Sequence, residues 1–233
     1  MDLGFLSFLS EPWFVLTWYG LSVPSAIWVL YDGYTANRHL NKAMKWAWPI
    51  LILFFSVVGL ALYIWSSRPP RIGQIKNDEA NKKAFHDYVQ SPFSKLTGTV
   101  AHCVGGGGLG IITAMAVARL LDVSFWEEFW LMFLAGYVLS WLIFQYIAMR
   151  RMTDSRLMAL WMGGRAEIFT MLTAMTGMGL FMGYVTPTVV GQQPDPSTYA
   201  FWGFAAFGLL AAFVVSYPMA WILIRMGWKH GMG

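Results

Sequence analysis

The sequence has little charge for its length. Asp, Glu, Lys and Arg make up 12% of its 233 residues, whereas 57% are hydrophobic and the mean hydropathy is +0.51. A soluble domain carries roughly 25% charged residues, so this chain lacks much of the polar surface that water requires. The deficit excludes an ordinary soluble domain and predicts an integral membrane protein in contact with the lipid bilayer.

Cysteine is also scarce, because Cys103 is the only one in the chain. A single cysteine excludes an intrachain disulfide and any zinc or redox site that needs two cysteines. No HExxH sequence and no nucleophile elbow occur, so nothing here identifies an enzyme. The net charge of +4 comes from Lys and Arg between apolar runs, where they orient a membrane chain and do not indicate a nucleic-acid partner.

What the chain does contain is long apolar runs. A helix needs about 20 apolar residues to cross the hydrocarbon core, and spans without strict alternation are helices. The opening "MDLGFLSFLSEPWF" has no Lys or Arg, so we expect a retained first helix and not a cleaved signal. The sequence predicts an all-α polytopic bundle of about six transmembrane helices. The runs cover approximately 13–31, 47–66, 99–121, 125–149, 157–185 and 200–226.

The spacing of these runs predicts three parts. We expect an N-terminal two-helix transmembrane hairpin over residues 1–66, a polar connecting loop over 67–98, and a four-helix transmembrane domain over 99–233. Within the loop, the stretch "KNDEANKKAFHDY" predicts one short surface helix from Asn77 to Tyr88.

The basic residues predict an orientation. Lys plus Arg number 3 between the first and second runs, 6 between the second and third, 3 between the fourth and fifth, and 2 at or after the end of the sixth (Arg225 and Lys229), while the other two loops have none. With six crossings, the positive-inside rule places both termini in the cytoplasm. We expect the membrane to be the plasma (inner) membrane of a prokaryote. The first loop, with Arg38, Lys42 and Lys45, is the exception, and a re-entrant third run is the alternative.

The stretch "AHCVGGGGLG", residues 101–110, interrupts the third run with four consecutive glycines. It contains Gly-x-Gly-x-x-Gly, but no strand precedes it, so a dinucleotide site is not indicated. Small residues four apart predict close helix packing, and we expect the third and sixth helices to meet along them. The two small-residue faces are Gly106, Gly110, Ala114 and Ala118, and Gly208, Ala212, Ser216 and Ala220. Because each glycine costs about 1 kcal/mol against alanine inside a helix, we also expect local unwinding near residues 105–108.

Soft metal ligands form the second candidate feature. His102 and Cys103 are adjacent, and Met171, Met175 and Met178 form a stripe on the fifth helix. Thiolate, imidazole and thioether groups together suit cuprous copper. The alternative is that the cysteine and the methionines only fill the core, which is common for both residue types.

Charged residues within the apolar runs form the third candidate feature. Ionisable groups in a membrane span are functional candidates by default. Arg119 precedes Asp122 at the end of the third helix, where a snorkelling pair is ordinary, and Arg165 and Glu167 lie deeper, in the fifth helix.

Three stretches carry a resemblance to a known family. The order of "TAHCVGGGGLG", "GRAEIFTM" and "VSYPMAWILIRMGWKHGM" resembles the bacterial and archaeal membrane domain of unknown function 4396. That resemblance implies association with copper oxidases and a His-Cys motif, matched here by His102, Cys103, Leu109 and Gly110. The family's second cysteine, its aspartate and an acidic residue of the fifth helix are replaced by Gly107, Ile111 and Met175.

These features predict a non-catalytic subunit or accessory protein of a larger membrane complex, with a membrane-protein partner or a homo-oligomer. The alternative is copper handling or transport through His102, Cys103 and the methionines of the fifth helix. A small-solute transporter that uses the glycine segment is the second alternative.

Overall fold

A computed structural model describes residues 3–70, 72, 74, 77–150 and 153–229. This part of the chain is helical and contains no strand, and six of its helical segments are long and apolar enough to cross a membrane. The prediction of an all-α bundle with about six apolar helices is confirmed. The elements are η1 (Gly4–Ser10), α1 (Pro12–Tyr34), α2 (Lys42–Ser67), α3 (Asp78–Val89), α4 (Pro92–Leu120), α5 (Phe125–Leu139), η2 (Ser140–Gln145), α6 (Tyr146–Met149), α7 (Arg156–Leu180), η3 (Phe181–Val185), α8 (Thr186–Val190) and α9 (Tyr199–Arg225), of which η2 and η3 are π-helical.

The short surface helix forms where the polar sequence predicts it. The Asn77 side chain accepts hydrogen bonds from the backbone N–H groups of Glu79 and Ala80, which caps α3. An N-cap of this kind satisfies donors that a helix start leaves free. Arg38, in the loop between α1 and α2, pairs with Asp78 of α3, so α3 lies beside that loop.

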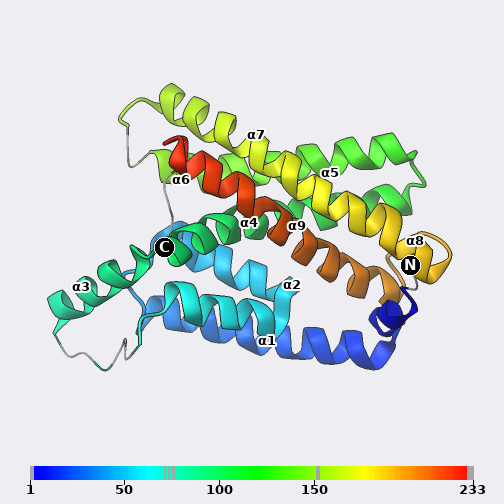
Figure 1. The fold of residues 1–233 in the computed structure, drawn as a ribbon, viewed down its shortest axis with the longest axis horizontal. Helices are drawn as coiled ribbons and strands as arrows, with labels where there is room; N and C mark the ends of the chain where they lie inside the picture. The colour runs from blue at the N-terminus through cyan, green and yellow to red at the C-terminus, as the bar shows by residue number, and fades with distance from the viewer. Residues whose placement is uncertain (1–2, 71, 73, 75–76, 151–152, 230–233) are drawn as a thin grey trace.

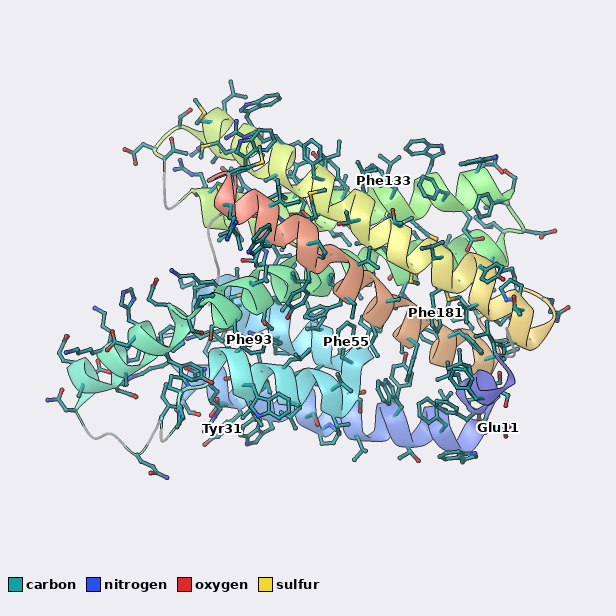
Figure 2. All side chains as sticks on the ribbon, in the orientation of Figure 1. Glu11, Tyr31, Phe55, Phe93, Phe133 and Phe181 are labelled. Carbon is teal, nitrogen blue, oxygen red and sulfur yellow. The ribbon has the colours of Figure 1, made fainter. Side chains whose placement is uncertain are left out.

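The helices form a bundle with two chemically different ends (Figure 1). We call one the basic end; it contains the loop 35–41, α3, the start of α7 and Lys229. We call the other the acidic end; it contains η1 and the loops 121–124 and 191–198. Figure 2 shows Glu11 and Tyr31, near the two ends of α1, at opposite ends of the bundle. The first described residue therefore lies at the acidic end and the last described residue at the basic end.

α2 is folded in two and does not run from end to end. A straight helix of 26 residues would be about 39 Å long. Yet the Trp48 indole donates to Ser67 Oγ at 3.1 Å, and Asn37, just before α2, donates to the carbonyl of Ser67 at 2.8 Å. The reversal is at Ser56, whose backbone is left-handed with φ 49° and ψ −133°. Both legs of α2 therefore reach the basic end, and Figure 1 shows them side by side.

The turn at Ser56 is buried and its polar groups are satisfied by α1. The Ser56 hydroxyl donates to the carbonyl of Trp18, and the Trp18 indole donates to the carbonyl of Phe54. Irregular backbone within a membrane is tolerated only where protein or a cavity covers it. A Cβ atom at Gly59 would lie 2.9 Å from Phe55 Cβ, so glycine lets the returning leg start close to the first.

The folded α2 corrects the predicted path of the chain. Five apolar segments, those starting at α1, α4, α5, α7 and α9, run between the two ends, whereas α2 returns to the end from which it starts. These five passages leave the first and last described residues at opposite ends of the bundle, whereas six passages would leave them at the same end. The segment that folds back is α2 and not the third run, since α4 is continuous over 29 residues.

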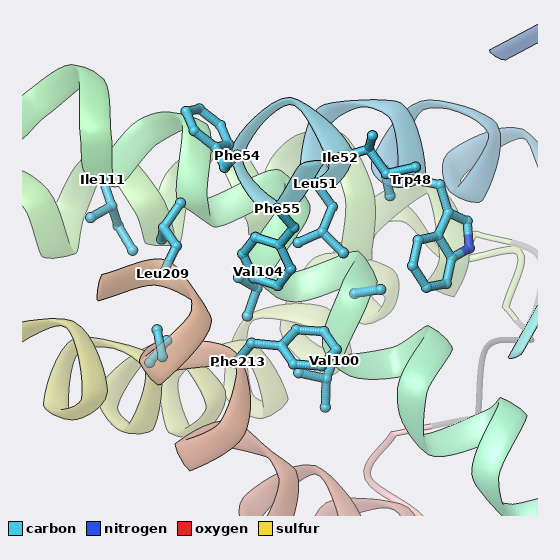
Figure 3. Close-up of a cluster of buried hydrophobic side chains, with 14 of the residues drawn as sticks. Trp48, Leu51, Ile52, Phe54, Phe55, Val100, Val104, Ile111, Leu209 and Phe213 are labelled. Atoms are coloured by element: carbon cyan, nitrogen blue, oxygen red, sulfur yellow. The ribbon is translucent and has the colours of Figure 1, made fainter. Parts of the chain in front are cut away.

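The first leg of α2 forms the core together with α4 and α9. Figure 3 shows Leu51 and Phe55 of this leg facing Val104 of α4 and Phe213 of α9. The Phe55 ring packs edge-on against Phe213 at 5.4 Å between centroids. Trp48, Leu51, Ile52 and Phe55 are all buried. The burial of these large apolar side chains holds the first leg of α2 inside the bundle.

The glycine run stays helical, which corrects the prediction of local unwinding. Each glycine faces a different neighbour, so close packing occupies every side of α4. A Cβ atom at Gly105 would lie 2.7 Å from the carbonyl oxygen of Ala47 in α2, and one at Gly107 would lie 2.6 Å from Met171 Cε in α7. The run therefore offsets its low helix propensity by letting several helices approach at once.

The small-residue faces pair differently from the prediction. A Cβ atom at Gly110 would lie 2.6 Å from the carbonyl oxygen of Ala135 in α5, and one at Gly106 would meet Phe144 of η2. α4 does contact α9, but through other residues, among them Gly108 and Leu209, and Thr97 and Tyr217. Gly208 and Ala212 of α9 face α7, so the predicted meeting of the two faces is wrong. Small residues spaced four positions apart identify where a helix is closely packed, but they do not indicate which helix packs there.

Candidate functional site

A buried polar centre lies where α4, η2 and α7 meet. Cys103 comes from α4, Glu167 and Thr170 from α7, and Ser140 and Gln145 from η2. Ser140 and Gln145 are five positions apart, and both donate to Glu167. A π-helical turn places residues i and i+5 on one side, which explains why both reach the same carboxylate.

Lys229 completes this centre from the far end of the chain. α9 ends at a Schellman motif: the Trp228 N–H donates to the carbonyl of Leu223 and the Gly227 N–H to that of Ile224. Gly227 has φ 69°, a conformation that glycine adopts readily. The reversal turns the chain back toward the bundle, where the Lys229 side chain is buried.

The Lys229 ammonium group has three partners. Its Nζ donates to Glu167 Oε2 at 2.8 Å, to Thr170 Oγ1 at 2.7 Å and to Cys103 Sγ at 2.8 Å. Glu167 Oε2 also accepts from Gln145 Nε2 at 2.9 Å, and its Oε1 accepts from Ser140. The side chains of Lys229 and Glu167 are 1% and 0% exposed. Two buried opposite charges with all these hydrogen bonds meet the condition under which burial of an ion pair is tolerated.

His102 stands beside this centre with both ring nitrogens unpaired. Within the described residues, neither Nδ1 nor Nε2 has a hydrogen-bond partner, although the side chain is buried. The ring packs edge-on against Phe144 at 5.3 Å. Gln145 Oε1 is also buried and unpaired. Buried polar atoms without partners are uncommon and mark places where water or a ligand binds.

The predicted metal-ligand residues are only partly brought together. Cys103 belongs to the polar centre and His102 stands beside it. Met171 lies one helical turn beyond Glu167, and Met175 one turn further on. Met178 is directed elsewhere, since a Cβ atom at Gly208 of α9 would lie 2.7 Å from its sulfur. Across the described residues, no group of three or more His, Cys, Asp or Glu side chains could hold a metal ion.

A cavity of about 430 Å³ opens between α4, α5 and α7 at the acidic end. Arg119 and Glu128 line it and form an ion pair, 3.0 Å from Nε to Oε1. Arg119 also donates to Gln193 and to the carbonyl of Pro194. The expected pairing of Arg119 with Asp122 is therefore wrong. The cavity has four methionines in its wall, namely Met115, Met132, Met175 and Met182.

Three layers of side chains connect this cavity to the polar centre. The innermost is Cys103, Ser140 and Glu167. The next is a tight layer in which Gly107 and Gly136 leave room for the Met171 side chain, whose Sδ would be 3.2 Å from a Cβ atom at Gly136. The outermost belongs to the cavity wall and contains Met115, Met132 and Met175.

Arg165 does not belong to the polar centre, although it precedes Glu167 by two positions. Its guanidinium lies over the Trp228 ring at 4.9 Å, and its Nε is buried without a partner among the described residues. Sequence reasoning identified Cys103 and Glu167 but missed Ser140, Gln145, Thr170 and Lys229. For Lys229 the available signal was Gly227, which ends the helix and returns the chain.

These observations define a class: a multi-pass helical membrane protein with a buried polar centre in its C-terminal helices. The family model for a domain of unknown function (DUF4396) matches residues 93–229, more than half of the chain, and the chain belongs to that family. The match contains every residue of the polar centre. Comparisons with curated proteins and with solved structures found no match.

Proposed function

We propose that this chain binds a small soft cation within the membrane and passes it along the axis between α4, α5 and α7, with cuprous copper as the best match. The observation that carries the proposal is the succession of sulfur-bearing side chains from Met175 in the cavity wall, through Met171 one helical turn away, to Cys103 in the polar centre. Thioether and thiolate sulfur are the ligands that favour cuprous copper over harder ions.

The layers suggest how an ion would move. The methionines of the cavity offer several equivalent thioether ligands, so an ion entering past Arg119 and Glu128 can change partners. Met171 fills the space between Gly107 and Gly136 and separates the cavity from Cys103. Because methionine is unbranched and flexible, a change of its rotamer would open this layer without moving a helix.

Lys229 then acts as a built-in substitute for the cargo ion. Its ammonium already lies against Cys103, Glu167 and Thr170. A cuprous ion that binds Cys103 replaces the proton of the thiol, and the ammonium must leave to make room for it. The same carboxylate cannot keep both cations in one place, so arrival of the ion and withdrawal of Lys229 are coupled.

We also infer that the basic end faces the cytoplasm. With α2 folded back, every loop that carries Lys or Arg flanks the same end of the bundle, including the loop with Arg38 that was an exception under six crossings. The acidic end has Glu11, Asp122 and Asp195 and no basic loop residue. The positive-inside rule then places the N-terminal end outside, and the methionine-lined cavity opens to the outside.

A copper-binding measurement tests the proposal. Protein purified in mild detergent is titrated with cuprous ion under reducing conditions against a competing chelator. We expect stoichiometric binding that Met175→Leu weakens and Cys103→Ser abolishes, because a hydroxyl is a poor ligand for a soft ion. Met178→Leu is the matched control, since it removes a buried sulfur of the same helix that faces α9.

Equal loss in the Met175 and Met178 variants would contradict the sulfur path. Intact wild-type protein without cuprous affinity would remove copper handling altogether. In that case the predicted accessory role would describe the chain better, and mild purification with identification of the co-purified proteins would test it.

A further inference from the structure

A second hollow, separate from the sulfur-lined cavity, lies on the outside of the bundle near the basic end. It has a volume of about 500 Å³ and runs between the α5–η2 segment, α7 and Trp228. Its walls are aromatic and aliphatic, with Tyr137, Trp141, Trp161 and Phe169 among them. Arg165 is the one charged residue in this lining.

Hydrogen bonds hold the two walls of this groove together. The Tyr137 hydroxyl donates to the carbonyl of Gly164, and the Trp141 indole donates to the carbonyl of Leu160. A Cβ atom at Gly164 would lie 2.9 Å from the Trp141 ring, so Gly164 and Trp141 are in close contact at the floor of the groove. The groove is therefore a preformed feature of the α5–α7 contact.

No group among the described residues balances the charge of Arg165. No hydrogen bond or ion pair of its side chain is found in the described part of the chain, and its Nε is buried. Its guanidinium is stacked over the Trp228 ring. This contact uses the flat face of the guanidinium and provides no hydrogen-bond acceptor for its N–H groups. A guanidinium in apolar surroundings without an acceptor is costly, and a bidentate anion is the partner that suits it best.

The position of Arg165 selects the kind of anion. It is nine residues into α7 from Arg156, or about 14 Å along the helix from the basic end, and an arginine side chain reaches several ångströms toward the interface. The outer wall is exposed and apolar, with Trp161 65% and Phe169 39% exposed. Such a wall suits hydrocarbon chains rather than water.

We propose that this groove binds one anionic phospholipid of the leaflet at the basic end. The phosphate is held by the Arg165 guanidinium with Trp161 beside the headgroup, and an acyl chain runs deeper along Ile168 and Phe169. The argument is charge complementarity together with a groove that opens sideways on the apolar surface of the bundle. It does not depend on the passage of copper.

The site also has a consequence for the polar centre. Trp228, which carries the stacked Arg165, is the residue directly before Lys229. Lipid that fixes Arg165 and Trp228 therefore holds the turn that presents Lys229 to Glu167. Occupancy of the groove should stabilise the buried ion pair, and the two sites are linked through one peptide bond.

Native mass spectrometry of the full chain from nanodiscs tests the proposal. The probe is phosphatidylglycerol against phosphatidylcholine of the same acyl chains. We expect a retained phosphatidylglycerol adduct on the wild type and about a tenfold weaker one on Arg165→Gln, as for loss of a charge-assisted hydrogen bond. Arg225→Gln is the matched control, because Arg225 is exposed at the same end and stacks on Trp221 at 3.8 Å.

Three results would overturn the proposal. One is equal loss of the adduct in Arg165→Gln and Arg225→Gln, which indicates general charge attraction. Another is a wild type that retains phosphatidylcholine as strongly as phosphatidylglycerol. The third is displacement of phosphatidylglycerol by an equimolar long-chain fatty acid, which would assign the groove to a carboxylate. If Arg165→Gln does not fold, Trp161→Ala replaces it, because its side chain is largely exposed and its loss should weaken the same adduct.

Discussion

Lys229 and Glu167 are 62 positions apart in the sequence, yet their charged atoms are 2.8 Å apart inside the bundle. The contact ties the segment after α9 to the middle of α7, and it also includes the single cysteine. Removing one member of a buried ion pair leaves the other charge without compensation, which typically costs about 3–5 kcal/mol. Removing both charges costs less.

The first prediction concerns this pair. Lys229→Met should lower the thermal unfolding midpoint of the detergent-solubilised protein strongly, because Glu167 is then buried without a cation. The double variant Lys229→Met with Glu167→Gln should recover much of the loss. Lys82→Met, at an exposed position of α3, should leave the midpoint unchanged. A double variant less stable than Lys229→Met would contradict the uncompensated-charge explanation.

Two residues of the polar centre, Cys103 and Glu167, could be predicted from the sequence. Cys103 and Glu167 stand out because polar groups are rare within apolar runs, and this signal needs no structure. Lys229 lies outside the runs, where a lysine normally anchors a helix end in the interface. Its burial depends on the turn at Gly227 and on the space between α4 and α7. These are tertiary features that the local sequence does not contain.

The second prediction concerns the fold of α2. Gly59→Leu should reduce the yield of monodisperse protein on size-exclusion chromatography, because the new side chain meets Phe55 and Ile52 at the start of the returning leg. Overpacking of this kind costs roughly 1–3 kcal/mol. Gly20→Leu in α1 is the control, since nothing lies within 4 Å of a Cβ atom there. Equal yields from both variants would argue against the close approach of the two legs.

The reversal of α2 could not be predicted from apolar length. Lys42–Ser67 satisfies every requirement for a span in length and composition, and a single serine at position 56 is only a weak turn signal. The left-handed backbone is stabilised by contacts with Trp18, which is 38 positions away. The sequence did contain one indication, namely the basic loop with Arg38 that six crossings could not explain. If five segments run from end to end, that loop lies at the basic end and agrees with the positive-inside rule.

The third prediction concerns the glycine run. Gly110→Leu should destroy the folded protein, because any side chain at this position meets backbone atoms of Ala135 and Gly136 in α5. Backbone cannot move aside as a flexible side chain can. Gly179→Leu provides the control, as a Cβ atom there has nothing within 4 Å. Leu109→Ala should also be mild, since Leu109 is 43% exposed. A folded Gly110→Leu protein would remove the α4–α5 contact from the explanation.

The fourth prediction separates the folded α2 from a second crossing. Single cysteines are introduced at Ser7, Thr35 and Lys82, all exposed positions, and are labelled in intact cells and in inverted vesicles with a maleimide that does not cross the membrane. With α2 folded back, Thr35 and Lys82 lie on one side and Ser7 on the other. Six crossings require the opposite grouping, with Ser7 and Lys82 together and Thr35 apart. The wild type measures the background from Cys103, which should be small because that thiol is 4% exposed. Labelling of Thr35 and Lys82 from opposite sides would show that α2 crosses the membrane. It would also contradict the inference that the methionine-lined cavity opens to the outside.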